Sequence, residues 1–225
     1  MRKLMSSLFC LVILGALAHA EPKNEPTTLS TEQAKLLAQD KSGRLLLNGL
    51  STLTPEAAKE LARYDGWLSL NGLKSLSKEA AESLATHRGP LHLDGLTAVS
   101  PEVARALSQH YGDLSLKGLT TLSDEAGVEL AKQTGGRLYL NGVKSLSTEA
   151  GKALAQRKGG GPTHKVCLDG LESLTVEAAG ALAEAHFHNW DGRLPAIKTI
   201  PDDVARALAK RQGGLSLDGL TSLSD

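Results

Sequence analysis

The sequence contains few of the residues that cross-link small exported folds or anchor large interfaces. Its 225 residues include two cysteines, two tryptophans, three tyrosines and two phenylalanines. Cys10 lies in the N-terminal apolar segment, so a chain processed behind that segment keeps Cys167 alone and forms no internal disulfide. Its stability must then come from packing. The shortage of aromatic rings disfavours sugar binding by ring stacking and leaves few anchors of the kind that strong protein interfaces use.

The chain also lacks an excess of charge of either sign. Lysine and arginine together number 25, as do aspartate and glutamate. Loss of Arg2 and Lys3 with an N-terminal signal leaves 23 basic against 25 acidic residues, a net charge of −2. A surface so close to neutral has no general attraction for nucleic acid or anionic lipid. We therefore expect no nucleic-acid partner.

Long apolar runs are missing beyond the first 20 residues, MRKLMSSLFCLVILGALAHA. This stretch joins a basic start, a short apolar run and a small-residue end, the pattern of a secretory signal peptide cleaved near Ala20. The apolar run is about half the ~20 residues that a bilayer span needs, so we expect no stable membrane insertion. The sequence predicts a signal peptide over residues 1–20, a polar linker over 21–28, and export to the periplasm or the extracellular space.

The main feature that is present is one phrase, repeated along nearly the whole chain. The phrase L-x-L-x-G-L recurs every 23 to 28 residues. In the seventh unit Ala196 stands in place of the glycine. The recurring glycines are Gly49, Gly72, Gly95, Gly118, Gly142, Gly170 and Gly219. A repeated period of this length is typical of a solenoid, in which each unit contacts mainly its neighbours.

Each unit combines two periodicities, as in LSLNGLKSLSKEAAESLA at residues 68–85. Leucines alternate with polar residues up to the glycine, which predicts a short strand with one buried face. Ala80, Ala81, Leu84 and Ala85 then form the stripe of an amphipathic helix. The sequence predicts about eight strand–turn–helix units, whose eight strands stack into one parallel sheet.

Residues at the helix ends support this division. Serine or threonine stands at the expected N-cap in seven of eight units, and an acid follows two residues later, at the positive end of the helix dipole. The predicted caps are Ser30, Thr54, Ser77, Ser100, Ser123, Ser147 and Thr175. Glycines such as Gly66, Gly89 and Gly112 suit the left-handed residue that ends a helix.

An alternative is a small hairpin inside each unit. Asn-Gly and Asp-Gly between apolar residues are the strongest short hairpin signal, with LSL and LKSL as the arms. Such arms are very short, and Lys117-Gly118 fits the preferred pairs poorly. We prefer stacked parallel strands, one from each unit.

The repeat, written LxLxGLxxLSxEAAxxLAxxxG, resembles the leucine-rich repeat, and more closely the short leucine-rich-repeat-like units found in tandem in exported bacterial proteins. The resemblance covers residues 29–225 and implies a right-handed α/β solenoid with a parallel sheet on one face and helices on the other. The common family pattern places an asparagine three residues after LxL, where this chain has residues such as Leu73 or Val143. The residue that forms the family's buried asparagine ladder is therefore missing.

By analogy with leucine-rich repeats, the outward strand positions would face a ligand. They form two columns, given by the two variable letters of LxLx. The candidate binding residues on these columns are His92, Asp94, Lys117, Tyr139, Asn141, Cys167 and Asp169, and Trp190 is added from the irregular unit at 186–203. Three alternatives stay open: the columns are a solvated polar face, Trp190 fills a gap in the core, and Cys167 is a passive thiol.

No group of residues indicates catalysis. A nucleophile, its base and its orienting group must meet at one place, whereas the serines and acids that recur here serve as caps. Residues that occur once cluster between 159 and 203, beginning with an insertion at 159–165. There His164, His186 and His188 lack the spacing and companions of a zinc site, and KGGGP lacks the Lys-Ser/Thr of a phosphate-binding loop. We expect no catalytic residues, metal or cofactor.

The sequence therefore favours an exported, non-catalytic scaffold that binds an unknown protein or other macromolecule through the strand face or the irregular segment. The alternative is a structural or self-assembling component of the cell envelope. The sequence given stops at LSLDGLTSLSD, after a strand and its cap, so this edge could add a second copy end to end.

Overall fold

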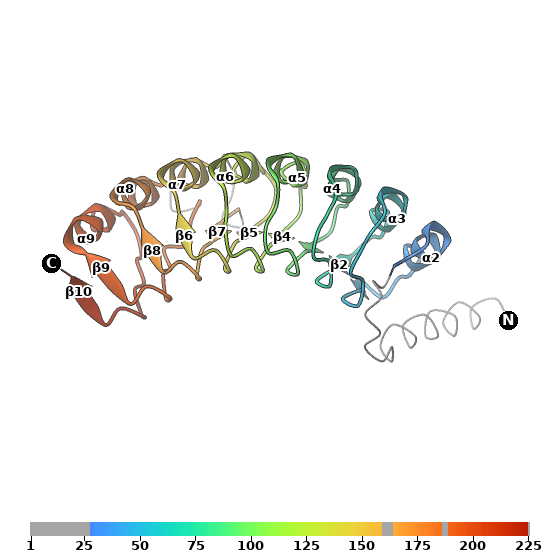
Figure 1. Ribbon diagram of the computed structural model, residues 1–225, viewed down its shortest axis with the longest axis horizontal. Coiled ribbons are helices and arrows are strands. Elements are labelled where there is room, and N and C mark those ends of the chain that lie inside the picture. Colours follow the sequence, from blue (N-terminus) through green and yellow to red (C-terminus); the bar gives the residue numbers. More distant parts are fainter. Residues whose placement is uncertain (1–27, 159–163, 186–188, 225) are drawn as a thin grey trace.

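A computed structural model describes residues 28–158, 164–185 and 189–224. Within them the chain coils into an arc, with the helices side by side along the convex edge and the turns beneath them (Figure 1). The helices are α2 (Thr31–Leu37), α3 (Pro55–Leu61), α4 (Lys78–Ala85), α5 (Pro101–Leu107), α6 (Asp124–Leu130), α7 (Thr148–Ala155), α8 (Val176–Glu184) and α9 (Asp202–Leu208). This is an α/β solenoid of the leucine-rich-repeat-like type.

One strand from each of the first six units enters a parallel sheet of order β1-β2-β3-β4-β5-β7. These strands are β1 (Arg44–Leu46), β2 (Trp67–Ser69), β3 (Leu91–His92), β4 (Leu114–Ser115), β5 (Leu138–Tyr139) and β7 (Val166–Cys167). The register advances by one unit at each step, for example from Leu68 to Leu91 and from Leu91 to Leu114. The hairpin alternative is wrong, because each of these strands pairs with neighbouring units.

A second short strand follows the turn in some units, and the sequence pattern did not predict it. These strands are β6 (Ser145–Leu146), β8 (Ser173–Leu174), β9 (Thr199–Pro201) and β10 (Ser222–Ser224), and they pair in parallel as β6–β8 and β9–β10. The residues ahead of the helices are extended, as at Ser147 with φ −66° and ψ 165°. Extended segments that stack at the repeat spacing can form hydrogen bonds with each other. The units that contain β6 and β8 therefore have the order strand–turn–strand–helix.

The main sheet breaks at the seventh unit, so the prediction of eight continuous strands is wrong. Two isolated bridges remain there, Val166 to Trp190 and Arg193 to Ser216. Trp190 therefore takes the strand position that leucine fills in other units. Gly192 lies between the two bridged positions and has a left-handed φ of 77°. The extra residues between Trp190 and Arg193 shift the register of strand pairing. The hydrogen-bonded pairing of the main sheet therefore cannot continue through them.

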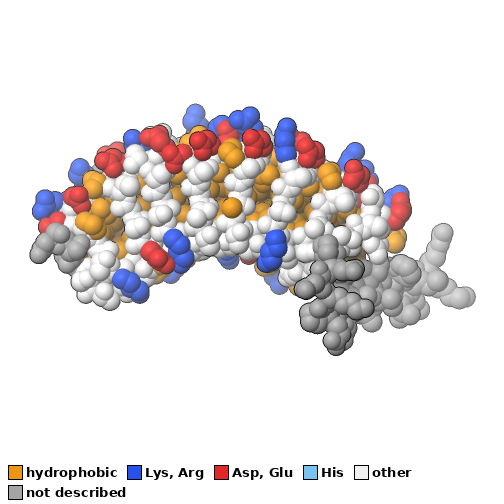
Figure 2. Space-filling view, in the orientation of Figure 1, with side chains coloured by type: hydrophobic (Ala, Val, Ile, Leu, Met, Phe, Trp, Pro, Cys, Tyr) orange, Lys and Arg blue, Asp and Glu red, His pale blue; other side chains and the backbone are white. Residues whose placement is uncertain are grey.

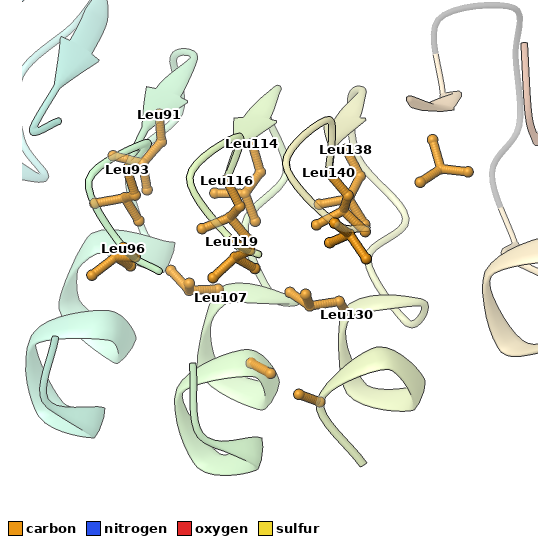
Figure 3. Packing of buried hydrophobic residues seen from close by; sticks show 14 of the residues in the cluster. Leu91, Leu93, Leu96, Leu107, Leu114, Leu116, Leu119, Leu130, Leu138 and Leu140 are labelled. Atoms are coloured by element: carbon orange, nitrogen blue, oxygen red, sulfur yellow. The ribbon is translucent and has the colours of Figure 1, made fainter. Parts of the chain in front are cut away.

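The core lies between the sheet and the helices. In Figure 3, Leu91, Leu93 and Leu96 of one unit lie in line with Leu114, Leu116 and Leu119 of the next, on the side of the helices. All six side chains are fully buried. Burying each leucine contributes about 2 kcal/mol relative to leaving it exposed. Among the described residues no helix has the length and apolar character to cross a membrane.

The predicted N-caps are confirmed in all seven units, because each hydroxyl accepts a hydrogen bond from the amide three residues on. The predicted left-handed glycines are wrong. Gly66, Gly89 and Gly112 do not have positive φ. At Gly89 the requirement is close packing instead, since a Cβ there would lie 2.0 Å from the carbonyl oxygen of Gly66.

Removal of one cap should have a measurable cost. The Ser100 hydroxyl accepts from the Val103 amide at 3.3 Å. We expect Ser100→Ala to lower the free energy of unfolding by about 1 kcal/mol, because α5 loses that acceptor. Urea unfolding followed by circular dichroism measures the change. Ser100→Asp restores an acceptor and should recover most of the loss; equal losses in both variants would contradict a capping role.

Candidate binding surface

The strand face is defined here as the outward side of the main sheet together with the residues that flank each strand. It has three columns. The first, just before the buried leucine, holds Arg44, Trp67, Pro90, Asp113, Arg137 and Lys165; the second holds Leu46, Ser69, His92, Ser115, Tyr139 and Cys167; the third holds Asn48, Asn71, Asp94, Lys117, Asn141 and Asp169. Sequence reasoning found the second and third columns and missed the first.

The third column hydrogen-bonds one unit to the next. Asn48 Oδ1 accepts from the Asn71 amide at 3.1 Å, and Asn71 Oδ1 accepts from the Asp94 amide at 2.9 Å. Asp94 Oδ1 continues the series by accepting from the Lys117 amide at 2.9 Å. An asparagine and aspartate ladder is therefore present, at the position directly after LxL rather than three residues later. Its side chains are exposed or half-buried.

Asp94 is fixed by this ladder. Burial opposes ionisation of its carboxyl, but three neighbours outweigh burial and lower its pKa to about 2. They are the His92 ring, whose Nδ1 lies 3.8 Å from Asp94 Oδ2, and two hydrogen-bond donors, Ser115 Oγ at 2.5 Å and the Lys117 amide. Asp94 is therefore ionised at neutral pH, and one of its oxygens is already occupied. Asn141 and Asp169 contact each other in the same column, with Asn141 Nδ2 donating to Asp169 Oδ2 at 2.8 Å.

Two groups of rings and cations stand on the strand face. The Arg44 guanidinium lies 4.3 Å from the Trp67 ring centre, and the His92 ring centre lies 4.6 Å from that of Trp67. Further along the sheet, Lys117 Nζ lies 5.0 Å from the Tyr139 ring. These distances favour cation–π attraction. The Trp67 ring contacts both Arg44 and His92, which leaves it less open to a stacked sugar than an isolated ring.

Cys167 lies on the second column as predicted, but it is buried, with 9 % of its surface exposed. Burial, followed by the nearby carboxylates of Asp191 and Asp169, raises the pKa of its thiol to about 12. Burial also raises the pKa of Asp191. A thiol in this environment is protonated at neutral pH and is a poor nucleophile.

This burial predicts a slow thiol. At pH 8 native Cys167 should react with Ellman's reagent more than about a hundredfold more slowly than the unfolded chain, because its thiolate is scarce and covered. Absorbance of the released chromophore gives both rates. A native rate within about tenfold of the unfolded one would contradict this account.

Trp190 is fully buried in the irregular unit. The Arg211 guanidinium lies 4.5 Å from its ring and donates to its carbonyl oxygen at 3.1 Å. Its side chain therefore has no surface to offer a ligand in this conformation, and its position fits the alternative that it fills a gap in the core. His92, Lys117 and Tyr139 remain partly or fully exposed on the strand face.

Sequence reasoning also missed a buried polar column, made of Tyr64, His87, His110, Gln133 and Arg157, each at most 2 % exposed. These residues follow the helices at intervals of 23 or 24, which is the signal that could have found them.

The second half of this column bonds to the unit before it. Gln133 Nε2 donates to the carbonyls of His110 and Gly112 at 3.2 and 2.9 Å. Arg157 donates to Gln133 Oε1 at 2.6 Å and to the carbonyl of Gly135 at 3.0 Å. Burial lowers the pKa of Arg157 to about 10, so it remains charged at neutral pH.

The first half of the column has stacked rings in place of these hydrogen bonds. The ring centres of His87 and His110 lie 6.1 Å apart and their planes are nearly parallel, at 3°. Neither ring nitrogen of either histidine has a partner of hydrogen-bond geometry. Burial lowers the pKa of His87, and burial together with the neighbouring His87 lowers the pKa of His110 to about 4. Both rings are neutral at pH 7.

The spacing of His164, His186 and His188 does not indicate a metal site. His186 and His188 fall outside the described residues, so no geometry is given for them. Within residues 28–158, 164–185 and 189–224, no three histidine, cysteine, aspartate or glutamate side chains are grouped to hold a metal ion.

Comparison with known proteins adds little to this geometry. No protein-family model matches the chain, and no curated protein matches it in sequence. A leucine-rich repeat protein of Leptospira interrogans is similar in structure at 16 % identity, over 83 % of this chain and 69 % of that chain, with a TM-score of 0.25. So low a score carries no argument here; the repeating strand–helix units of the chain itself define the fold.

Proposed function

We propose that this chain is an exported, non-catalytic interaction scaffold that binds a protein partner through its strand face. The proposal is supported above all by how charge is distributed between the two faces. On and beside the helices, many basic side chains have acidic partners, as in Arg63–Glu60 at 2.8 Å and Lys132–Glu129 at 2.7 Å. Lys35 and Lys59 have no such partner among the described residues. Figure 2 shows acidic and basic side chains mixed along the convex edge. Many of the charges on that edge are therefore paired with each other.

The strand face differs from the helix edge. Among the described residues, no ion pair involves Arg44, Lys117, Arg137, Lys165 or Arg193, all of which flank or lie on the strands. Trp67, His92 and Tyr139 stand beside these cations, half-buried. Arginine and large aromatic side chains are the residue types that most often anchor protein interfaces. A rigid stack of parallel strands holds them in place with little loss of entropy on binding.

The buried, protonated Cys167 argues against covalent catalysis on this face. The Asp94 carboxylate accepts from a backbone amide, and that of Asp169 accepts from the side chain of Asn141. A binding role requires only the cations and aromatic side chains of the strand face.

Capture from the medium or periplasm of the source cells tests the proposal. The strand-face variant carries His92→Ala, Lys117→Ala and Tyr139→Ala; the control carries Lys78→Ala, Glu82→Ala and Gln109→Ala on and beside α4 and α5. We expect the unaltered chain and the control to retain the same partner, and the strand-face variant to lose it. Equal retention by both variants rules out the strand face. A mass that rises with concentration and no captured partner would favour self-assembly instead.

A further inference from the structure

The cations of the strand face gather towards its C-terminal half. The basic strand patch, as we define it, consists of Lys117, Arg137, Lys165 and Arg193, from units four to seven. Arg137 and Lys165 directly precede β5 and β7 and lie side by side in register, because the adjoining residues Leu138 and Val166 are paired. Like charges side by side on adjacent strands repel each other and do not stabilise a sheet. Folding alone does not account for this pair.

Four acids near the patch accept hydrogen bonds from the chain, whereas Asp218, in the unit after Arg193, is exposed. Asp113 Oδ1 accepts from the Arg137 amide at 2.7 Å, and Asp191 Oδ1 accepts from the Arg193 amide at 3.2 Å. Asp94 is engaged in the ladder and Asp169 accepts from Asn141. All four carboxylates are half-buried, whereas Lys117, Arg137 and Arg193 are exposed. Three of the four cations are therefore more exposed than these four carboxylates, and an approaching ligand meets those three first.

A hollow of about 370 Å³ adjoins the patch where the main sheet breaks. It is lined by Lys165, Asp191, Arg211, Gln212, Gly213 and Gly214. Arg211 donates to the carbonyls of Leu182, Trp190 and Gly214. A guanidinium has five N–H donors, so two of those on Arg211 are not used in these three hydrogen bonds. The hollow is thus lined by an ammonium, a guanidinium and the carboxylate of Asp191, around a space of side-chain size.

From these observations we infer that the basic strand patch and the adjoining hollow bind an acidic segment of a protein, with spaced Asp or Glu side chains facing Arg137 and Lys165 and one entering the hollow. This inference rests on the proposed function and names the chemistry of the partner. Half-buried carboxylates interrupt the positive surface, which disfavours a uniformly charged polymer or a flat anionic membrane. An extended peptide can place its acids beside the cations and its small residues beside the carboxylates.

Fluorescence anisotropy with defined probes tests the inference. The probes are a labelled 12-residue peptide of alternating Glu and Gly, the equivalent Lys-Gly peptide, and vesicles of phosphatidylglycerol and phosphatidylcholine. The purified full chain should bind the Glu-Gly peptide best, and added salt should weaken binding. Arg137→Ser with Lys165→Ser should weaken it about tenfold or more.

Two further variants keep the test decisive. Lys152→Ser with Arg206→Ser removes the same charge from the helices and should change the affinity less than about twofold. Arg137→Lys with Lys165→Arg keeps the charge and should retain binding, which separates loss of charge from loss of fold. The inference is overturned by no preference for the Glu-Gly peptide, by equal losses in both serine variants, or by stronger binding to the vesicles. If the natural partner still depends on the strand face in any of those cases, the proposed function stands without it.

Discussion

Replacing Gly95 with alanine should lower the free energy of unfolding by about 3 kcal/mol or more. A Cβ at this position would lie 2.1 Å from the carbonyl oxygen of Asn71 and 2.5 Å from that of Leu73. Both atoms belong to the backbone of the preceding unit, so no side chain can rotate away to make room. The two units would have to separate, and the ladder bond from the Asp94 amide to Asn71 would be weakened. Urea unfolding measures the change.

Gly180 gives a matched control within α8, because a Cβ there would meet nothing within 4 Å. Gly180→Ala should raise the free energy of unfolding by about 0.5–1 kcal/mol through the better helix propensity of alanine. Opposite signs for the two glycine-to-alanine changes would show that stacking distance controls the effect at Gly95. A loss below about 1 kcal/mol at Gly95 would mean that the units are less tightly stacked than described.

Acid should destabilise the solenoid through its buried histidines. The pKa of His110 is lowered from 6.5 to about 4, so the unfolded chain binds more protons than the folded one between these values. Stability is then complete above about pH 6.5 and falls as the pH is lowered towards 4. At 1.36 kcal/mol per pH unit, His110 alone accounts for about 3 kcal/mol. His87 adds to the loss, because its pKa is also lowered.

His110→Gln isolates this contribution. Glutamine already occupies the same place in the next unit, where Gln133 donates to two carbonyls of the unit before. We expect the variant to lose about 3 kcal/mol less than the unaltered chain between pH 6.5 and 4, as measured by urea unfolding at each pH. Asp94 titrates near pH 2 and does not interfere. The raised pKa of Asp191 opposes the loss, but it does so equally in both chains. Parallel pH curves for the two proteins would contradict the account.

The parts of the fold that the sequence predicted are those encoded within one unit. Alternating leucines, the alanine stripe and a cap such as Ser100 act within a few residues, so their pattern appears directly in the letters. Stacking of neighbouring units then follows from the period. Gly89 was misinterpreted because a glycine after a helix suits either a left-handed residue or close packing, and the contact with Gly66 that decides between them crosses units.

The binding surface was harder to predict for a related reason. Trp67 and Arg137 precede the buried leucine and were left out, because the phrase LxLx begins at that leucine, although alternation places the residue before it on the outward side too. Trp190 was placed among the binding candidates because the irregular unit does not follow the repeat pattern, so the strand position of Trp190 could not be assigned from the sequence. Its bridge to Val166 gives that position. The ladder function of Asp94 depends on an amide 23 residues away, and no local pattern shows such a bond.

The central claim is that the strand face, rather than the helix edge, holds the partner. Hydrogen exchange measured by mass spectrometry, with and without the captured partner, tests it most directly. The account predicts slower exchange on binding in the segments that contain β4, β5 and β7, around residues 114–117, 138–141 and 166–169, with α5, α6 and α7 unchanged. Protection confined to the helices, with these strand segments unaffected, would contradict it.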